Sequence, residues 1–551
     1  MQDNSGAGWP GPALTGLVSF EVVLGRACRR FGRVLLTRLF STQLYRLAGG
    51  RRFAVYSCLA YAALVLVVAL RHEPWRDEAD AWLAARDMTP IKLFHWLGAA
   101  GTPGLWYVLL MPLAKLGAPY EAMTLLHVAI SIATAALIAR RAPFPPIFRL
   151  LIIFSYYFCY EYAVIARSYA LTVLLMLLVA EVLTARISRP WRLGALLFLL
   201  FNTNAFGFFF GGIITVVAAV GAVRRGDRSR AVLGGALIAL AGGVLAFAQL
   251  LPPAHARPPY AGAHWAVLGD AFSQAFFPQI PAHFGFFLRH AHRWPSLAWS
   301  AYVAVRCLAA MIFLGVLLLI HGRRDALAIV VLSCAAVLYI SVSKWYGGER
   351  HAGLIFALVV FGLWMSRSPQ PGEQPAGQRP RTSAVGALTL LAFAASLSIS
   401  CAAAAIWSYR DIRWEYSGAK AAAAFIRDNS LTSIPIAAIP APQTEALLPY
   451  LPGTSFWYIG SQEFGTYVVW ERNWGADYAL TDGQIIGRVR RRFPSGPCLI
   501  LTATTPLNDP ENAGYHLIYH TSNYLFDENA RDESYYLYAR RGDAASKPTP
   551  Q

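Results

Sequence analysis

The residues best suited to catalysis lie in one short stretch, HEPWRDEADAW, which begins at His72. If this stretch is helical, Asp77 and Asp80 share one face because they are three residues apart, and Glu78 lies beside them. Neighbouring carboxylates can activate a nucleophile or hold a divalent cation. An ordinary role is equally open, since an acidic residue at the start of a helix is a common cap.

Two further groups carry positive charge. The first, EYAVIARSY, begins at Glu161 and contains Arg167, which could bind a phosphate through two hydrogen bonds. Arg167 could equally extend toward lipid headgroups. The second group, KWYGGERH, suits a polyanion, although its arginine could simply anchor a helix at the membrane surface. Its cationic or titratable residues are Lys344, Arg350 and His351.

The elements that must position these groups are membrane helices. Of the 551 residues, 56% are hydrophobic and 14% are charged, whereas a soluble domain carries about 25% charged residues. The net charge of +18 comes largely from arginine clusters between apolar runs, as in the cytoplasmic loops of membrane proteins. Nucleic-acid binders instead collect basic residues on one face of a soluble domain. The composition therefore predicts a polytopic membrane protein and excludes a nucleic-acid partner.

Eleven spans fit the hydropathy and charge pattern. They cover about residues 53–70, 121–139, 147–163, 170–186, 193–206, 207–223, 231–251, 301–320, 325–342, 350–366 and 384–407. The apolar segment 104–116 is too short to cross, since about 20 residues are needed, and we expect it to lie at the interface. With residues 1–52 as a basic cytoplasmic arm, this topology places all three candidate groups on the outer face.

Residues 53–407 are thus expected to form an all-α membrane domain, and residues 408–551 a soluble α/β domain on the periplasmic side. In the second region the sequence predicts a helix at 418–427 and strands at 434–439, 455–459, 467–470, 498–502 and 535–539. The cluster Tyr156, Tyr157, Tyr160 and Tyr162 is typical of an aromatic belt at a water interface.

A metal site is weakly indicated. The loop 252–300 contains five histidines, but only His290 and His292 are close together, and metal ligands need defined spacing. We assign no metal ligand, and a divalent cation at the acidic stretch is left as an alternative.

Three motifs together resemble a known family. They are DEA at Asp77, GTPGLWY at Gly101 and ARSYAL at Ala166. In order and spacing they are similar to those of integral-membrane glycosyltransferases of the C fold, of the protein O-mannosyltransferase and aminoarabinose-transferase type. The similarity covers residues 53–225 by motif and 226–407 by topology. It implies the C fold with about 11 transmembrane helices and transfer of a sugar from a polyprenyl-phosphate carrier.

The resemblance also implies roles for individual residues. Asp77 matches the acid that deprotonates or orients the acceptor, with Glu78 beside it, and Arg167 matches a basic residue near the carrier phosphate. The remaining substrate- or phosphate-binding candidates are Tyr169, Glu161, Lys344, Arg350 and His351. The chain departs from relatives that have an acid next to the Arg167 position, because here Glu161 is the nearest carboxylate.

The sequence therefore predicts an inverting, polyprenyl-phosphate-sugar-dependent glycosyltransferase of a bacterial inner membrane. Its acceptor would be an envelope lipid, glycan or protein. A polymerase or ligase that uses lipid-linked oligosaccharides would have a similar architecture. A transporter or flippase is a third possibility, but such proteins usually show internal repeats and charged residues at the bilayer midplane.

Overall fold

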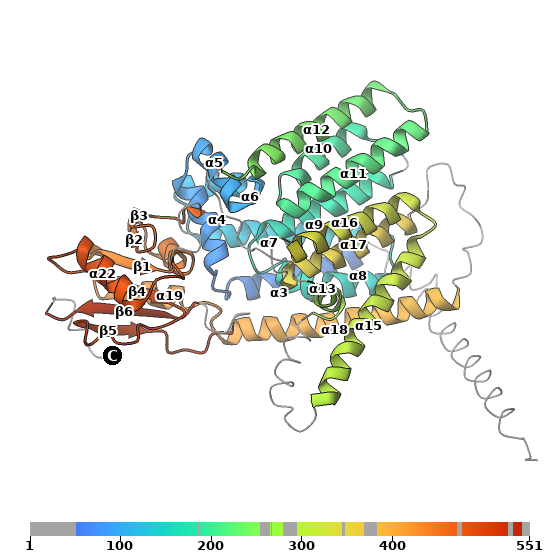
Figure 1. The fold of residues 1–551 in the computed structure, drawn as a ribbon. Helices are drawn as coiled ribbons and strands as arrows, with labels where there is room; N and C mark the ends of the chain where they lie inside the picture. The colour runs from blue at the N-terminus through green and yellow to red at the C-terminus, as the bar shows by residue number, and fades with distance from the viewer. Residues whose placement is uncertain are drawn as a thin grey trace, which may run out of the picture.

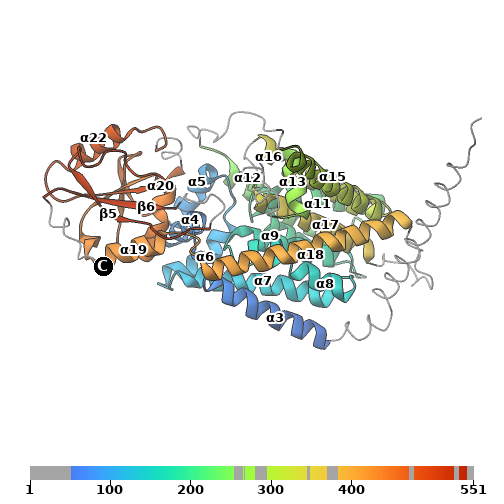
Figure 2. The ribbon, with the colours of Figure 1, turned by 90° about the horizontal axis from the view of Figure 1, so that it is seen from below.

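The computed structural model describes residues 51–185, 187–253, 265, 267–278, 295–343, 348–368, 383–470, 477–526 and 533–542. Lys344, the five histidines of the loop 252–300 and residues 1–50 of the basic arm lie outside these residues. Helices form a bundle, and a mixed sheet lies at one end of it (Figures 1 and 2).

Eight helices in the described part of the chain are long and apolar enough to cross a membrane. They are α3 (Arg51–Ala69), α7 (Glu121–Arg141), α11 (Ala205–Arg224), α12 (Arg230–Leu250), α15 (Pro295–Ile320), α16 (Arg324–Ser343), α17 (Glu349–Arg367) and α18 (Ala384–Arg413). The chain is a multi-pass membrane protein with a mostly helical body and a C-terminal sheet, which confirms the expected fold class.

The other predicted spans form shorter elements. Segment 147–163 divides into α8 (Pro146–Ile153) and the π-helix η1 (Tyr157–Glu161), while α9 (Ser168–Leu183) and α10 (Pro190–Phe201) cover the next two. The count of eleven crossings stays a prediction. Between α10 and α11, Asn202 donates to the carbonyl of Gly242 in α12 at 3.1 Å, so a polar contact joins the helices at this turn.

The aromatic belt predicted at Tyr156, Tyr157, Tyr160 and Tyr162 is wrong. All four side chains are buried, with at most 4% of their surface exposed. Each phenol has a partner inside the protein: Tyr157 donates to the carbonyl of Gln274 at 2.8 Å, for example. These tyrosines form the polar interior at one end of the bundle, since a hydroxyl that finds a buried acceptor need not reach water.

The segment between α3 and α7 folds into three helices: α4 (Arg76–Asp87), α5 (Pro90–Ala100) and α6 (Leu105–Lys115). Helix α5 begins at Thr89, whose side chain accepts from the amide of Lys92, and it ends at Gly101 in the left-handed conformation. Helix α6 has 11 residues, which span about 16 Å, roughly half the hydrocarbon thickness.

The C-terminal region contains a six-stranded sheet in the order β3-β2-β1-β4-β6-β5. Its strands are β1 (Ile436–Ile439), β2 (Phe456–Tyr458), β3 (Glu463–Gly465), β4 (Leu499–Ala503), β5 (Tyr515–His520) and β6 (Tyr535–Arg540). The central strands β2, β1 and β4 are parallel, and the outer pairs are antiparallel. Four predicted strands are confirmed, but 467–470 is not a strand, and β3 and β5 were not predicted.

Helices cover both faces of this sheet. Helix α22 (Asp482–Arg492) packs on one face, and α19 (Ala419–Asp428) and η3 (Glu445–Tyr450) pack on the other. Ala79 and Leu83 of α4 belong to the second of these cores, and Trp96 of α5 donates to the carbonyl of Val468 at 2.9 Å. The helix that carries the acidic residues is therefore packed into the sheet region as well as the bundle.

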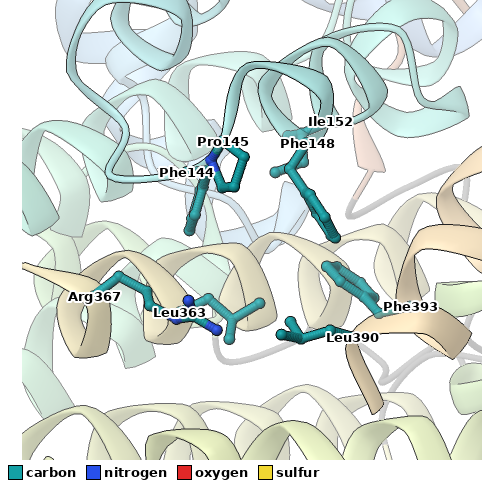
Figure 3. A pocket seen from close by; sticks show the side chains of 8 residues that line it. All are labelled: Phe144, Pro145, Phe148, Ile152, Leu363, Arg367, Leu390 and Phe393. Carbon is teal, nitrogen blue, oxygen red and sulfur yellow. The ribbon is translucent and has the colours of Figure 1, made fainter. Parts of the chain in front are cut away.

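A small apolar hollow lies between α8, α17 and α18 (Figure 3). Its lining includes Leu363 and Arg367 from the C-terminal end of α17. Arg350 lies at the other end of the same helix, and its 19 residues span about 28 Å. The hollow is thus remote from the polar residues described next.

Candidate active site

The structure brings the three candidate groups together around Asp77. The Oδ2 atom of Asp77 accepts from Nη1 of Arg350 at 3.0 Å and also from Nη1 of Arg167. A third guanidinium, Arg76, lies 3.7 Å from Oδ1. The paired residues are 90 and 273 positions from Asp77 in the sequence. The sequence predicted that the three groups lie on one face of the membrane. In the structure, side chains from all three groups are in direct contact.

Aromatic rings flank both guanidinium groups. The Arg350 guanidinium lies 4.9 Å from the ring of Trp75, and that of Arg167 lies 5.7 Å from the ring of Tyr169. Both distances lie in the range of cation–π attraction. Asp77 and Arg167 keep 29% and 28% of their side-chain surface exposed, and Arg350 keeps 12%. A ligand can therefore reach the cluster, while the rings restrict where its arginines point.

The Glu78 side chain fixes two backbone segments of the site relative to each other. Its Oε1 accepts from the amide of Ala166 at 2.6 Å, and its Oε2 accepts from the amide of Trp75 at 3.2 Å. The first contact fixes the residue before Arg167, and the second closes the first turn of α4. The Glu78 side chain is fully buried. This geometry separates it from the half-exposed Asp77.

A buried ionic network lies behind Glu78. His72 contacts Oε2 of Glu78 through Nε2 at 3.1 Å and Oδ2 of Asp411 through Nδ1 at 2.9 Å. Burial lowers the pKa of His72, but Asp411 and Glu78 together raise it well above its ordinary value. Tyr160 also donates to Asp411, at 3.0 Å. A protonated His72 thus joins the start of α4 to the end of α18.

Tyr169 and His351 support the arginines from the bundle side. Nδ1 of His351 accepts from the amide of Gly348 at 3.1 Å, so Nε2 carries the proton and donates to the Tyr169 hydroxyl at 3.1 Å. Tyr169 in turn stacks on Tyr162. Tyr162 donates to the carbonyl of Arg350 at 2.5 Å. These contacts tie the start of α17 to the start of α9.

Glu161 lies in the buried tyrosine cluster, and its charge acts on Tyr162 and Tyr169. It is buried and accepts from the hydroxyl of Tyr156 at 3.1 Å. Of the predicted site residues within the described part of the chain, Arg167 and Arg350 both contact Asp77, while Glu78, Tyr169 and His351 surround them. Lys344 lies outside the described residues.

A second pair of carboxyl groups lies where α4 meets the sheet region. Asp80 is 8% exposed and Glu445 of η3 is 1% exposed. Burial raises the pKa of both groups, and the charge on Asp80 raises that of Glu445 further. Glu445 accepts from the amide of Val468 at 2.9 Å. The Oδ1 atom of Asp80 has no hydrogen-bond partner among the described residues.

The pKa values of Asp77 and Asp80 move in opposite directions although they lie on one helix. Burial raises the pKa of Asp77, but Arg167, Arg350 and Arg76 lower it to about 2. Burial raises that of Asp80 to about 8, and the charge on Asp77 adds to this rise. At neutral pH Asp77 is therefore a carboxylate and Asp80 is mainly a neutral acid. Two acids in contrasting environments can take different roles in one site.

Sequence reasoning missed several residues that support the site. Asp411 was detectable, since an acidic residue near the end of an apolar helix is a functional candidate. Glu445 and Glu533 have no such signal, because Glu445 begins the short helix η3 and Glu533 lies in a turn of the sheet region. Glu533 nevertheless accepts from the amide of Arg76 at 2.8 Å and so caps the first turn of α4.

The described residues include no group of three or more His, Cys, Asp or Glu arranged to hold a metal ion. The acidic residues near Asp77 instead pair with arginine, with histidine or with one another.

No family model and no curated protein sequence matches the chain. Among solved structures, it is similar to apo ArnT from Cupriavidus metallidurans, with a TM-score of 0.48 and 14% identity over 90% of this chain and 99% of that chain. The same enzyme bound to undecaprenyl phosphate gives a TM-score of 0.49 and 13% identity over 91% and 100%. Arabinofuranosyltransferase AftD from Mycobacteria gives 0.44 and 13% over 89% and 40%.

Proposed function

We propose that this protein transfers a sugar from a polyprenyl-phosphate-linked donor to an acceptor hydroxyl on the outer face of a bacterial inner membrane. The observation that carries the proposal is the contact of one carboxylate, Asp77, with two guanidinium groups, Arg167 and Arg350, at one end of the membrane helices. Arginine pairs suit phosphate, and a carboxylate can accept a proton from a hydroxyl. The family resemblance of the surrounding motifs supports the same chemistry.

In the proposed reaction, the acceptor oxygen attacks the anomeric carbon of the sugar as the bond from that carbon to the phosphate oxygen breaks. The configuration inverts, because attack and departure occur on opposite sides. The acceptor proton moves to Asp77, and the polyprenyl phosphate leaves with the bonding electron pair. Arg167 and Arg350 offset the negative charge that develops on the phosphate. Lys344 is proposed to add to this positive charge.

The surrounding residues have positioning roles in this proposal. Glu78 fixes both α4 and the segment before Arg167, so we assign it to holding the geometry and not to proton transfer. Tyr169 and His351 brace the two arginines. Glu161, which accepts from the hydroxyl of Tyr156, is proposed to line the substrate-binding side of the site.

The acceptor is proposed to approach Asp77 along the boundary between α4 and the sheet region. Asp77 lies on the helix that both parts of the molecule share. An envelope lipid, a glycan and a protein hydroxyl all remain acceptor classes for this site. The basic arm 1–52 is proposed to lie on the cytoplasmic side, and residues 408–551 on the periplasmic side.

Reconstitution into liposomes tests the proposal. Purified protein is incubated with polyprenyl-phosphate-linked sugars and envelope extracts, and free polyprenyl phosphate and glycosylated products are measured by mass spectrometry. We expect both products to appear in equal amounts. Movement of the lipid-linked sugar across the bilayer without release of polyprenyl phosphate would instead support a flippase, and would overturn the proposal.

A further inference from the structure

Asp77 occupies the place that an anionic ligand of Arg167 and Arg350 would need. Both guanidinium groups donate to the same carboxylate oxygen, Oδ2, and the rings of Trp75 and Tyr169 limit their movement. A phosphate bound by these arginines would use the N–H groups that now contact Asp77. The carboxylate and the phosphate therefore compete for one pair of cations.

In this paired state Asp77 is poorly suited to accept a proton. Burial raises its pKa, but the three neighbouring arginines lower it to about 2. A general base works best when its pKa is close to the working pH. The ion pairs that hold Asp77 must therefore loosen before it can activate an acceptor hydroxyl.

Once Arg167 and Arg350 bind the phosphate, the groups that remain around Asp77 favour a higher pKa for its carboxyl group. Asp80 lies one turn further along α4, and Glu445 approaches from η3. Tyr169 and His351 face the site from the bundle, and neither brings positive charge to it in the tautomer described above. Arg76, 3.7 Å away, is then the remaining cation beside Asp77 among the described residues. Asp77 becomes more basic as a result.

We propose that Asp77 is a placeholder for the donor phosphate: its carboxylate occupies the phosphate site on Arg167 and Arg350 until the donor binds. This inference rests on the proposed function. The phosphate takes over Arg167 and Arg350, and the same event frees the Asp77 carboxylate to act on the acceptor. Binding is then ordered: the donor enters first, and an acceptor that arrives alone meets an ion-paired, weakly basic Asp77. After transfer, the departing polyprenyl phosphate is replaced on the arginines by Asp77, which returns its proton to solvent.

The test is the affinity of the protein for undecaprenyl phosphate as a probe, measured in nanodiscs for the wild type and for Asp77→Asn. Asparagine keeps the size of the side chain but removes the competing charge, so we expect the probe to bind about tenfold more tightly or better. If the amide variant does not fold, Asp77→Ser gives the same comparison. Asp270→Asn is the matched control, because Asp270 pairs with Arg306 away from this cluster, and we expect unchanged affinity.

Three outcomes would contradict the placeholder role in distinguishable ways. Equal affinity of wild type and Asp77→Asn would show that Asp77 and the phosphate do not compete. Weaker binding by Asp77→Asn would show that the carboxylate organises the arginines while the phosphate is bound. Failure of every protein, including the wild type, to bind the probe would overturn the proposed function and this inference with it.

Discussion

The Glu78 carboxylate accepts a hydrogen bond of 2.6 Å from the backbone amide of Ala166. This contact joins helix α4 to the segment that immediately precedes Arg167. The two residues lie 88 positions apart in the sequence, and the bond is fully buried. It fixes the distance between Asp77 and Arg167, so the geometry around Asp77 depends on a buried side chain whose own hydrogen bonds are to other residues.

We expect Glu78→Gln to destabilise the protein and slow transfer. Glutamine can still accept the hydrogen bond from the amide of Ala166. Its NH₂ group would then face the N–H group at Nε2 of the protonated His72, so that two hydrogen-bond donors would point at each other. Breaking such a buried charged network costs about 2–4 kcal/mol. Thermal unfolding and the transfer rate measure both effects. Glu121→Gln, at the exposed start of α7, is the control, and equal unfolding temperatures for the two variants would contradict the role assigned to Glu78.

Asp77→Asn is expected to leave the protein folded and to abolish transfer. Without a carboxylate the acceptor proton has no local base, a loss worth about 10²- to 10⁴-fold in rate. The transfer assay is run together with thermal unfolding, so that misfolding is recognised. Near-normal transfer by a folded Asp77→Asn protein would rule out Asp77 as the base.

Asp80 should make stability depend on pH. Its pKa is raised by burial to about 8 in the folded protein, above about 3.9 for an unfolded chain. The folded state thus holds a proton that the unfolded state releases, and the wild type loses stability as pH rises from about 4 to 8. Asp80→Asn lacks this proton, so its unfolding temperature should rise relative to the wild type as pH increases. Parallel pH profiles of the two proteins would contradict the prediction.

Gly353 is expected to tolerate no side chain. A Cβ at this position of α17 would collide with the ring of Tyr157 and with the hydroxyl of Tyr162, and this hydroxyl donates to the carbonyl of Arg350. Gly353→Ala should therefore lower the unfolding temperature and weaken undecaprenyl phosphate binding. Gly483→Ala in α22 is the control, because a Cβ there meets nothing within 4 Å. Unchanged affinity in Gly353→Ala would show that α17 can shift without moving Arg350.

Much of the architecture follows from properties that are local in the sequence. Apolar runs, arginine clusters and turn residues predicted a polytopic helical protein with a C-terminal α/β region, because hydropathy and periodicity depend on neighbouring residues. The same patterns predicted that Asp77, Arg167 and Arg350 lie on one side of the membrane. They left a capping role and a catalytic role for the acidic stretch equally open.

The sequence by itself therefore determined the class of protein and the residues that could do chemistry. Only the tertiary structure decided what each of them contacts: Asp77 between two arginines, Glu78 buried, and the tyrosine cluster inside the bundle and not at its surface. The physical reason is that the partner of a charged group or a hydroxyl comes from a segment that is distant in the sequence. Asp411, Glu445 and Glu533 support the site in this way. The position of Asp411 near the end of an apolar helix marks it as a candidate, but nothing in the local sequence of Glu445 and Glu533 distinguishes them from acids that face water.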